Sequence, residues 1–159
     1  MAGGKGKIIR VALQFLRRTR RRARRPASYR PVPRGTSPGV RRLPSGRMPA
    51  NYRWAGRVYD GPEWTPRLKA KYPNGVRFTN DGFPDFSPYA RQGSTVHFQP
   101  RFRGDVADEA LANRRIGLTR TPDGYTWHHH QDTQTMMLVP TDLHRGIRHA
   151  GGASFLEGF

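Results

Sequence analysis

The chain of 159 residues is long enough for one domain with a single hydrophobic core, and its formal net charge is +18. It contains no cysteine, which excludes disulfide bonds and thiolate metal sites, so any metal ion has to be held by histidine and carboxylate side chains. No apolar run approaches the roughly 20 residues of a membrane-spanning helix, and we therefore expect no integral membrane association.

The N-terminal third carries most of the positive charge. Of the 29 lysines and arginines, 15 lie in residues 1–50, which contain no acidic residue. Apolar residues along one helical face in 8–25, followed by an arginine run, predict a basic amphipathic helix or a disordered arm that binds anions. The proline-rich segment 26–50 predicts an extended linker. We see no convincing cleavage site and expect no signal peptide.

A basic arm of this kind seeks polyanions, because each contact with a phosphate releases counterions. Nucleic acid is the first expectation, while an anionic membrane surface, an acidic protein partner and a merely solubilising arm remain alternatives. The arm residues expected to contact nucleic-acid phosphates are Arg17, Arg18, Arg20, Arg21 and Arg22.

Residues 51–159 predict a small folded domain of the α+β class. In chain order, its first expected elements are a strand at 76–79, a proline-broken ordered loop at 83–89, a strand at 95–98 and a helix at 105–116. The helix contains neither glycine nor proline, and Asp105 is its expected N-cap.

The C-terminal elements predict a ββα unit at about 124–152. Two antiparallel strands at 125–130 and 135–139 are joined by a polar loop. Pro140 then opens a last helix, which we expect to end at the pair Gly151-Gly152.

Histidines concentrate in this unit. Five of the six lie within residues 128–149. Imidazole is the natural ligand for zinc or a transition metal where cysteine is absent. The neighbours His128 and His129 point to opposite sides of a strand, which suits one to bind metal and the other to act as a base.

Several residue series stand out in and before this unit: Gly124–His130 with its Trp-His-His, Met137–Pro140, Asp142–His144 and His149–Gly152, together with Asn74–Phe78, Phe83–Tyr89 and Ala112-Asn113 upstream. These series resemble the WHH family of the HNH/endonuclease VII (His-Me finger) superfamily of nucleases. The resemblance covers roughly residues 72–153 and leaves residues 1–50 outside.

This resemblance implies a metal-dependent DNA endonuclease with low sequence specificity, of the kind found in bacterial toxins that an immunity protein neutralises. Carried over by position, His129 would be the general base, His128 and His144 would bind the divalent ion (Mg, Zn, Mn or Ni), and His149 would be a third metal ligand or a phosphate contact. We expect Arg145 and Arg148 to contact nucleic acid, with RNA also possible as substrate.

The further expectations are a monomer, an acidic immunity protein as partner, and a bacterial protein that acts in the cytoplasm or is delivered into a target cell. The alternative function is a non-enzymatic basic nucleic-acid-binding protein in which the histidines hold a structural zinc.

The sequence departs from the family pattern in two places. The HNH asparagine that orients the base is missing, because residues 131–149 contain no Asn. Gln131, Asp132, Gln134 or a backbone carbonyl would have to replace it. His144 and His149 are five residues apart, which separates them by about 140° on a regular helix. Both can bind one ion only if the helix is distorted or ends before His149.

Overall fold

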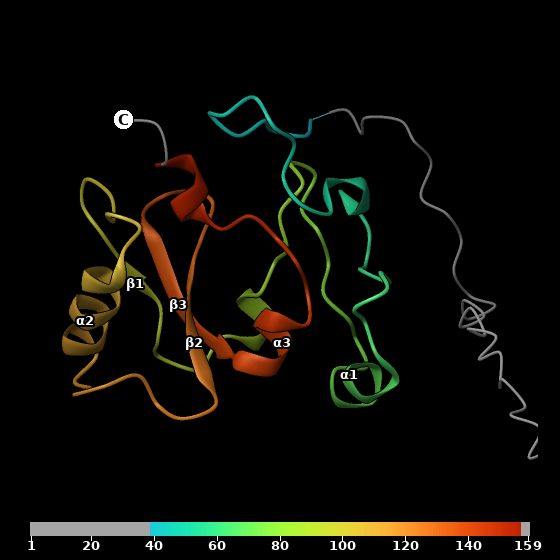
Figure 1. Cartoon of the computed structure of the whole chain (residues 1–159). Helices are drawn as coiled ribbons and strands as arrows, with labels where there is room; N and C mark the ends of the chain where they lie inside the picture. The colour runs from blue at the N-terminus through green and yellow to red at the C-terminus, as the bar shows by residue number, and fades with distance from the viewer. Residues whose placement is uncertain (1–38, 157–159) are drawn as a thin grey trace, which may run out of the picture.

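The computed structural model describes residues 39–156, which form a small α+β domain as the sequence predicts (Figure 1). Its helices and strands are, in chain order, α1 (Pro66–Lys71), β1 (Val96–His97), α2 (Val106–Arg115), β2 (Tyr125–His129), β3 (Thr135–Pro140) and α3 (Thr141–Arg145). Short 3-10 helices lie at Tyr52–Trp54, Ser87–Tyr89 and Gly152–Phe155.

The three strands form one antiparallel sheet in the order β1-β3-β2. The predicted hairpin is confirmed, with His128 opposite Met137 and His129 opposite Met136. The Asp132 carboxylate holds the turn between its strands by accepting the backbone N–H groups of Gln134 at 2.8 Å and Thr135 at 2.7 Å. This turn chemistry fixes the register, which in turn decides the face on which each histidine lies.

Both faces of the central strand β3 are buried, which gives the domain two hydrophobic clusters. Met137 and Val139 belong to the cluster that contains Phe86 and Leu143. Met136 and Leu138, whose side chains alternate with these along the strand, pack with Trp127 and Ala112 on the α2 side. In Figure 1, α2 accordingly lies on one side of the sheet and α3 on the other.

The helix predicted at 105–116 is confirmed as α2, with Asp105 as its N-cap. The Asp105 carboxylate accepts the Ala107 N–H at 2.9 Å. On the buried face, the Trp127 indole donates to the Asn113 side-chain oxygen at 3.0 Å. This bond ties α2 to β2 immediately before the consecutive histidines.

The strand predicted at 95–98 is confirmed as β1, but the one predicted at 76–79 is wrong. Phe78 and its neighbour Arg77 make only isolated bridges, to Ala55, Val58 and Pro84. Each potential partner segment is too short and irregular to continue a ladder, and Pro84 has no N–H to donate.

The predicted end of the last helix is also wrong. The helix α3 has five residues and ends at Gly146, whose N–H bonds the Asp142 carbonyl at 2.9 Å. A Cβ atom at Gly146 would lie 2.5 Å from Leu68 Cδ1 and 2.9 Å from the Asp142 carbonyl oxygen, so a larger residue would force these neighbours to shift. The chain leaves the helical path here and returns across the end of β2.

The segment that follows α3 also packs closely against β2 at Gly152. An added Cβ atom there would lie 1.9 Å from the His130 carbonyl oxygen, so the C-terminal segment packs directly on the backbone at the end of β2. The positions of His149 and of the β2 histidines are therefore coupled through backbone contact.

Residues 39–50, which the sequence assigns to the linker, run along this domain. Pro49 is fully buried, and the Arg41 guanidinium lies 4.3 Å from the centre of the Phe155 ring. The predicted amphipathic helix, the first part of the linker and the five arm arginines lie outside the described residues. Within residues 39–156, no helix combines the length and apolar character needed to cross a membrane.

Candidate metal centre and neighbouring histidine

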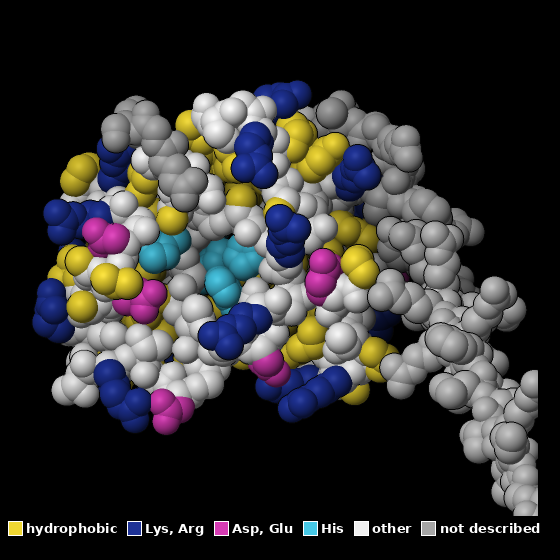
Figure 2. Space-filling view, in the orientation of Figure 1, with side chains coloured by type: hydrophobic (Ala, Val, Ile, Leu, Met, Phe, Trp, Pro, Cys, Tyr) yellow, Lys and Arg dark blue, Asp and Glu magenta, His cyan; other side chains and the backbone are white. Residues whose placement is uncertain are grey.

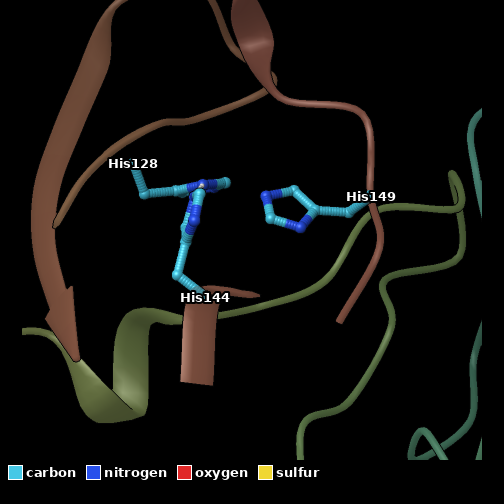
Figure 3. Close-up of side chains that lie close together, drawn as sticks. All are labelled: His128, His144 and His149. Atoms are coloured by element: carbon cyan, nitrogen blue, oxygen red, sulfur yellow. Dashed lines mark hydrogen bonds between the residues drawn. The ribbon is translucent and has the colours of Figure 1, made fainter. Parts of the chain in front are cut away.

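Three imidazoles from three segments converge beside the sheet. His128 comes from β2, His144 from α3 and His149 from the turn that follows α3 (Figure 3). One nitrogen of each ring lies within 4.8 Å of the others, and His128 Nδ1 is 3.4 Å from His144 Nε2. Ligand atoms around a tetrahedral zinc ion, each about 2.0–2.1 Å from the metal, are roughly 3.3 Å apart. The group can therefore hold a metal ion.

The buried ring of Phe86 contacts all three of these imidazoles. Its centre lies 4.9 Å from that of His128, 5.7 Å from that of His144 and 5.1 Å from that of His149. An aromatic ring that touches every candidate ligand restricts how each can tilt and excludes water from one side of the group. Phe86 belongs to the loop expected at 83–89, and nothing in the sequence shows that its ring meets the histidines.

The third candidate ligand, His149, reaches the group because α3 ends before it. Its Nδ1 atom lies 2.7 Å from the Ile147 carbonyl oxygen, so Nδ1 carries the proton and Nε2 keeps a lone pair. The Asn51 amide donates to the Arg148 carbonyl at 2.6 Å and holds the same turn. The 140° separation expected on a regular helix does not arise.

Burial keeps these imidazoles neutral. Burial, followed by the nearby charges of His149 and His144, lowers the pKa of His128 well below its usual value. Burial, followed by the charges of His149 and Arg145, lowers the pKa of His144 to about 4. Burial also lowers the pKa of His149. Neutral imidazole is the form that binds a metal ion.

A second observation also bears on whether the three imidazoles bind a metal ion. His128 is only 2% exposed, and its Nε2 atom is buried without a hydrogen-bond partner among the described residues. An unsatisfied buried polar atom costs roughly 1–3 kcal/mol. Coordination through Nε2 would satisfy this atom, whereas coordination through Nδ1, the nitrogen that lies 3.4 Å from His144 Nε2, would leave it unpaired.

These lowered pKa values predict how the metal-free protein responds to acid. The unfolded chain binds more protons than the folded one between the ordinary histidine pKa of 6.5 and the folded value of about 4 for His144. Stability is therefore fully present above pH 6.5 and is lost as the pH falls toward 4, by up to about 1.4 kcal/mol per pH unit for each such histidine.

Urea unfolding in EDTA at constant ionic strength measures this slope. The variant His144→Gln, which removes one of the titrating groups, should flatten it. A stability that stays constant or rises between pH 6.5 and 4 would contradict the neutral buried imidazoles.

The remaining predicted site residue of β2, His129, points to the opposite side of the sheet. Its Nε2 atom lies 3.2 Å from Asp108 Oδ2, and the Phe102 ring centre is 4.7 Å from its own. Asp108 is a functional candidate that the sequence analysis misses. Its only sequence signal is its place three residues after Asp105, which is typical of a helix cap.

The other two histidines have local partners. His130 Nδ1 lies 3.2 Å from Asp132 Oδ2, in the hairpin turn. His97 Nδ1 lies 3.1 Å from the Thr135 hydroxyl. Neither is in the group of three candidate ligands.

Basic side chains surround the histidines on the face shown in Figure 2. Arg145 and Arg148 are exposed, and the structure gives their side chains no ion-pair partner among residues 39–156. A cavity of about 510 Å³ lies beside His149, lined in part by Arg47, Arg148 and Asn51. This open, positively charged surface is suited to contact a polyanion.

Comparison with known families agrees with the geometry. Residues 117–159 match the model of the WHH family, described as a nuclease of the HNH/ENDO VII superfamily with conserved WHH. The match spans β2, β3, α3 and all three ligand histidines, whereas α2 with Asp108 and the loop with Phe86 lie before it. A comparison with curated proteins gave no match.

Proposed function

We propose that this chain, which carries a WHH nuclease unit of the HNH/ENDO VII superfamily in residues 117–159, is a metal-dependent endonuclease that hydrolyses DNA. The observation that carries this proposal is the convergence of three neutral imidazoles beside a separate histidine on the adjacent position of β2. The three rings supply a cation site, and the fourth is left for proton transfer.

In the proposed reaction, His129 accepts a proton from a water molecule whose oxygen attacks the phosphorus atom. The P–O bond to the departing nucleoside then breaks, and the released oxygen takes a proton from solvent. A divalent ion held by His128, His144 and His149 would supply stabilisation of the negative charge on the phosphate and on the departing oxygen. Exposed Arg145 and Arg148 would contact the phosphates on either side.

The charge distribution supports a polyanionic substrate with little sequence preference. The chain has a net charge of +18, and contacts between arginine and phosphate carry no direct sequence information. In the biological setting that we propose, the protein is a bacterial toxin or effector that acts as a monomer and is neutralised by an acidic immunity protein. Complementary charge would speed that association.

Plasmid cleavage tests the proposed activity. Supercoiled DNA incubated with the full chain and Mg²⁺, Mn²⁺, Ni²⁺ or Zn²⁺ in turn should become nicked and linear with at least one of these ions. EDTA should stop the reaction, and restoring that ion should recover it. Cleavage that persists in EDTA, or its absence with every ion, would overturn the proposal. Single-stranded DNA and RNA substrates in the same assay define the preferred nucleic acid.

The burial of the histidine group also supports a second candidate, a nucleic-acid-binding protein with a structural zinc. Here the orphaned His128 nitrogen would matter for folding rather than for catalysis. Thermal unfolding with and without EDTA separates the two functions. A structural site predicts that the protein unfolds when the metal is removed, whereas the nuclease predicts a folded but inactive metal-free protein.

A further inference from the structure

Asp108, in the first turn of α2, is a buried carboxylate with an unusual number of donors. Only 2% of the residue is exposed. The carboxylate accepts the backbone N–H of Arg103 at 2.9 Å on Oδ1, and that of Gly104 at 2.6 Å on Oδ2. The N–H of Asp105 adds a longer bond at 3.2 Å. These backbone bonds hold the carboxylate in place, and its remaining hydrogen-bond partner is His129.

The bond between these two residues determines where the proton of the imidazole lies. Burial raises the pKa of Asp108, but the backbone hydrogen bonds and the bond from His129 outweigh it and lower the pKa overall. An ionised carboxylate can only accept hydrogen bonds, so Nε2 of His129 must carry a hydrogen atom. The lone pair of the neutral ring is then on Nδ1.

That second nitrogen is not completely buried, although only 14% of the His129 side chain is exposed. The structure gives His129 Nδ1 no hydrogen-bond partner among residues 39–156, and this nitrogen is not among their buried, unpaired polar atoms. The edge of the imidazole against Phe102 restricts rotation of the ring. The lone pair on Nδ1 is therefore unpaired, held in one orientation and not sealed from water, as a group that takes a proton from water requires.

The groups expected to replace the missing HNH asparagine do not reach this imidazole. Asp132 bonds the hairpin turn, and the Gln134 amide donates to the Pro100 carbonyl at 2.8 Å. Buried Gln131 makes no hydrogen bond to His129 in the described part of the chain. Asp108 is therefore the one side chain, among residues 39–156, that hydrogen-bonds His129.

We propose that Asp108 is the positioning residue for His129: it fixes the imidazole with hydrogen on Nε2 and leaves Nδ1 as the proton acceptor. This inference rests on the proposed nuclease function. It assigns to α2, which lies before the WHH unit, a role that the HNH pattern gives to an asparagine between the strand and the last helix. Asp108 acts through His129 and need not touch the substrate.

Asp108 also supports the start of α2, so the test needs a control for helix stability. Asp105 provides it, because Asp105 caps the same helix end through the Ala107 N–H and makes no contact with His129. The variant Asp105→Ala should damage the helix start alone. Asp108→Ala should affect both the helix and the histidine, and Asp108→Asn retains one oxygen that can accept the Nε2–H.

The primary readout is the tautomer of His129 in the metal-free protein, measured by ¹⁵N NMR of the imidazoles at mildly alkaline pH. The full chain should show the Nε2–H tautomer at His129. Asp105→Ala should keep it, while Asp108→Ala should give a mixture of tautomers. An Nδ1–H tautomer in the unmodified chain would overturn the inference, whether or not the protein cuts DNA.

The second readout is single-turnover cleavage with saturating metal. Asp108→Ala should lower the rate constant by roughly 10- to 100-fold, because a misplaced base loses part of its usual contribution. Asp105→Ala should change it less than about twofold, and Asp108→Asn should fall between them. An equal loss in Asp108→Ala and Asp105→Ala would show a structural role only. Absence of cleavage in the unmodified chain would instead overturn the nuclease proposal and leave the tautomer result standing.

Discussion

Replacing His144 with alanine should weaken binding of the divalent ion by about 100-fold or more and abolish metal-stimulated cleavage. The side chain supplies one of three imidazole nitrogens that lie within 4.8 Å of one another. Even partners outside the ligand shell are commonly worth 10- to 100-fold in metal affinity, so loss of a ligand should exceed that range. His144 is partly exposed on a short helix, so the fold should tolerate the change better than it would tolerate loss of buried His128.

Calorimetric titration with Zn²⁺ or Ni²⁺ at neutral pH measures the affinity, and circular dichroism checks the fold. His97→Ala is the matched control, because His97 is an exposed histidine of β1 outside the ligand group. It should bind the ion as tightly as the unmodified chain. Unchanged affinity in His144→Ala would show that the three rings do not share an ion.

Replacing His129 with alanine should slow cleavage while leaving metal binding nearly unchanged. General-base catalysis typically contributes 10²- to 10⁴-fold, so cleavage should slow by roughly that factor. The affinity for the metal ion should change little, because His129 is not one of the three imidazoles that lie within 4.8 Å of one another and its hydrogen-bond partner is Asp108. Single-turnover cleavage and calorimetry on the same preparation measure the two quantities.

The adjacent residue supplies the comparison for this variant. His130→Ala removes a partly exposed imidazole whose partner is Asp132 in the hairpin turn. Its cleavage rate should stay within a few-fold of the unmodified chain. A larger loss of cleavage in His130→Ala than in His129→Ala would show that His129 is not the general base. Undiminished cleavage in His129→Ala would show that His129 takes no part in the reaction.

The elements around the candidate site could be predicted wherever the signal is local. The N-cap residue Asp105 indicates where the helix α2 begins, and two apolar runs around a polar loop predict the hairpin. The resemblance to the WHH family singled out the three ligand candidates that the structure brings together, although the spacing of His144 and His149 argued against a shared ion on a regular helix. For α2 and for the hairpin, the residues that determine the structure lie within a few positions of one another.

The features that sequence reasoning missed depend on contacts between distant segments. The last helix ends at Gly146, where the chain packs closely against Leu68, far upstream. Asp108 meets His129 across 21 positions, and Phe86 contacts His128 from a loop that lies still further upstream in the chain. A periodic pattern contains no information about such approaches, so the sequence raised the difficulty of His149 but could not resolve it.

The Phe86 contact has a consequence for transplanting the site. The histidine hairpin and α3 form a short contiguous stretch, which invites grafting onto another scaffold. Yet the ring beneath all three imidazoles belongs to a segment some 40 residues earlier, outside the stretch that matches the family. A graft limited to residues 117–159 would leave the three rings without their common support, so a working transplant must also bring the loop that carries Phe86.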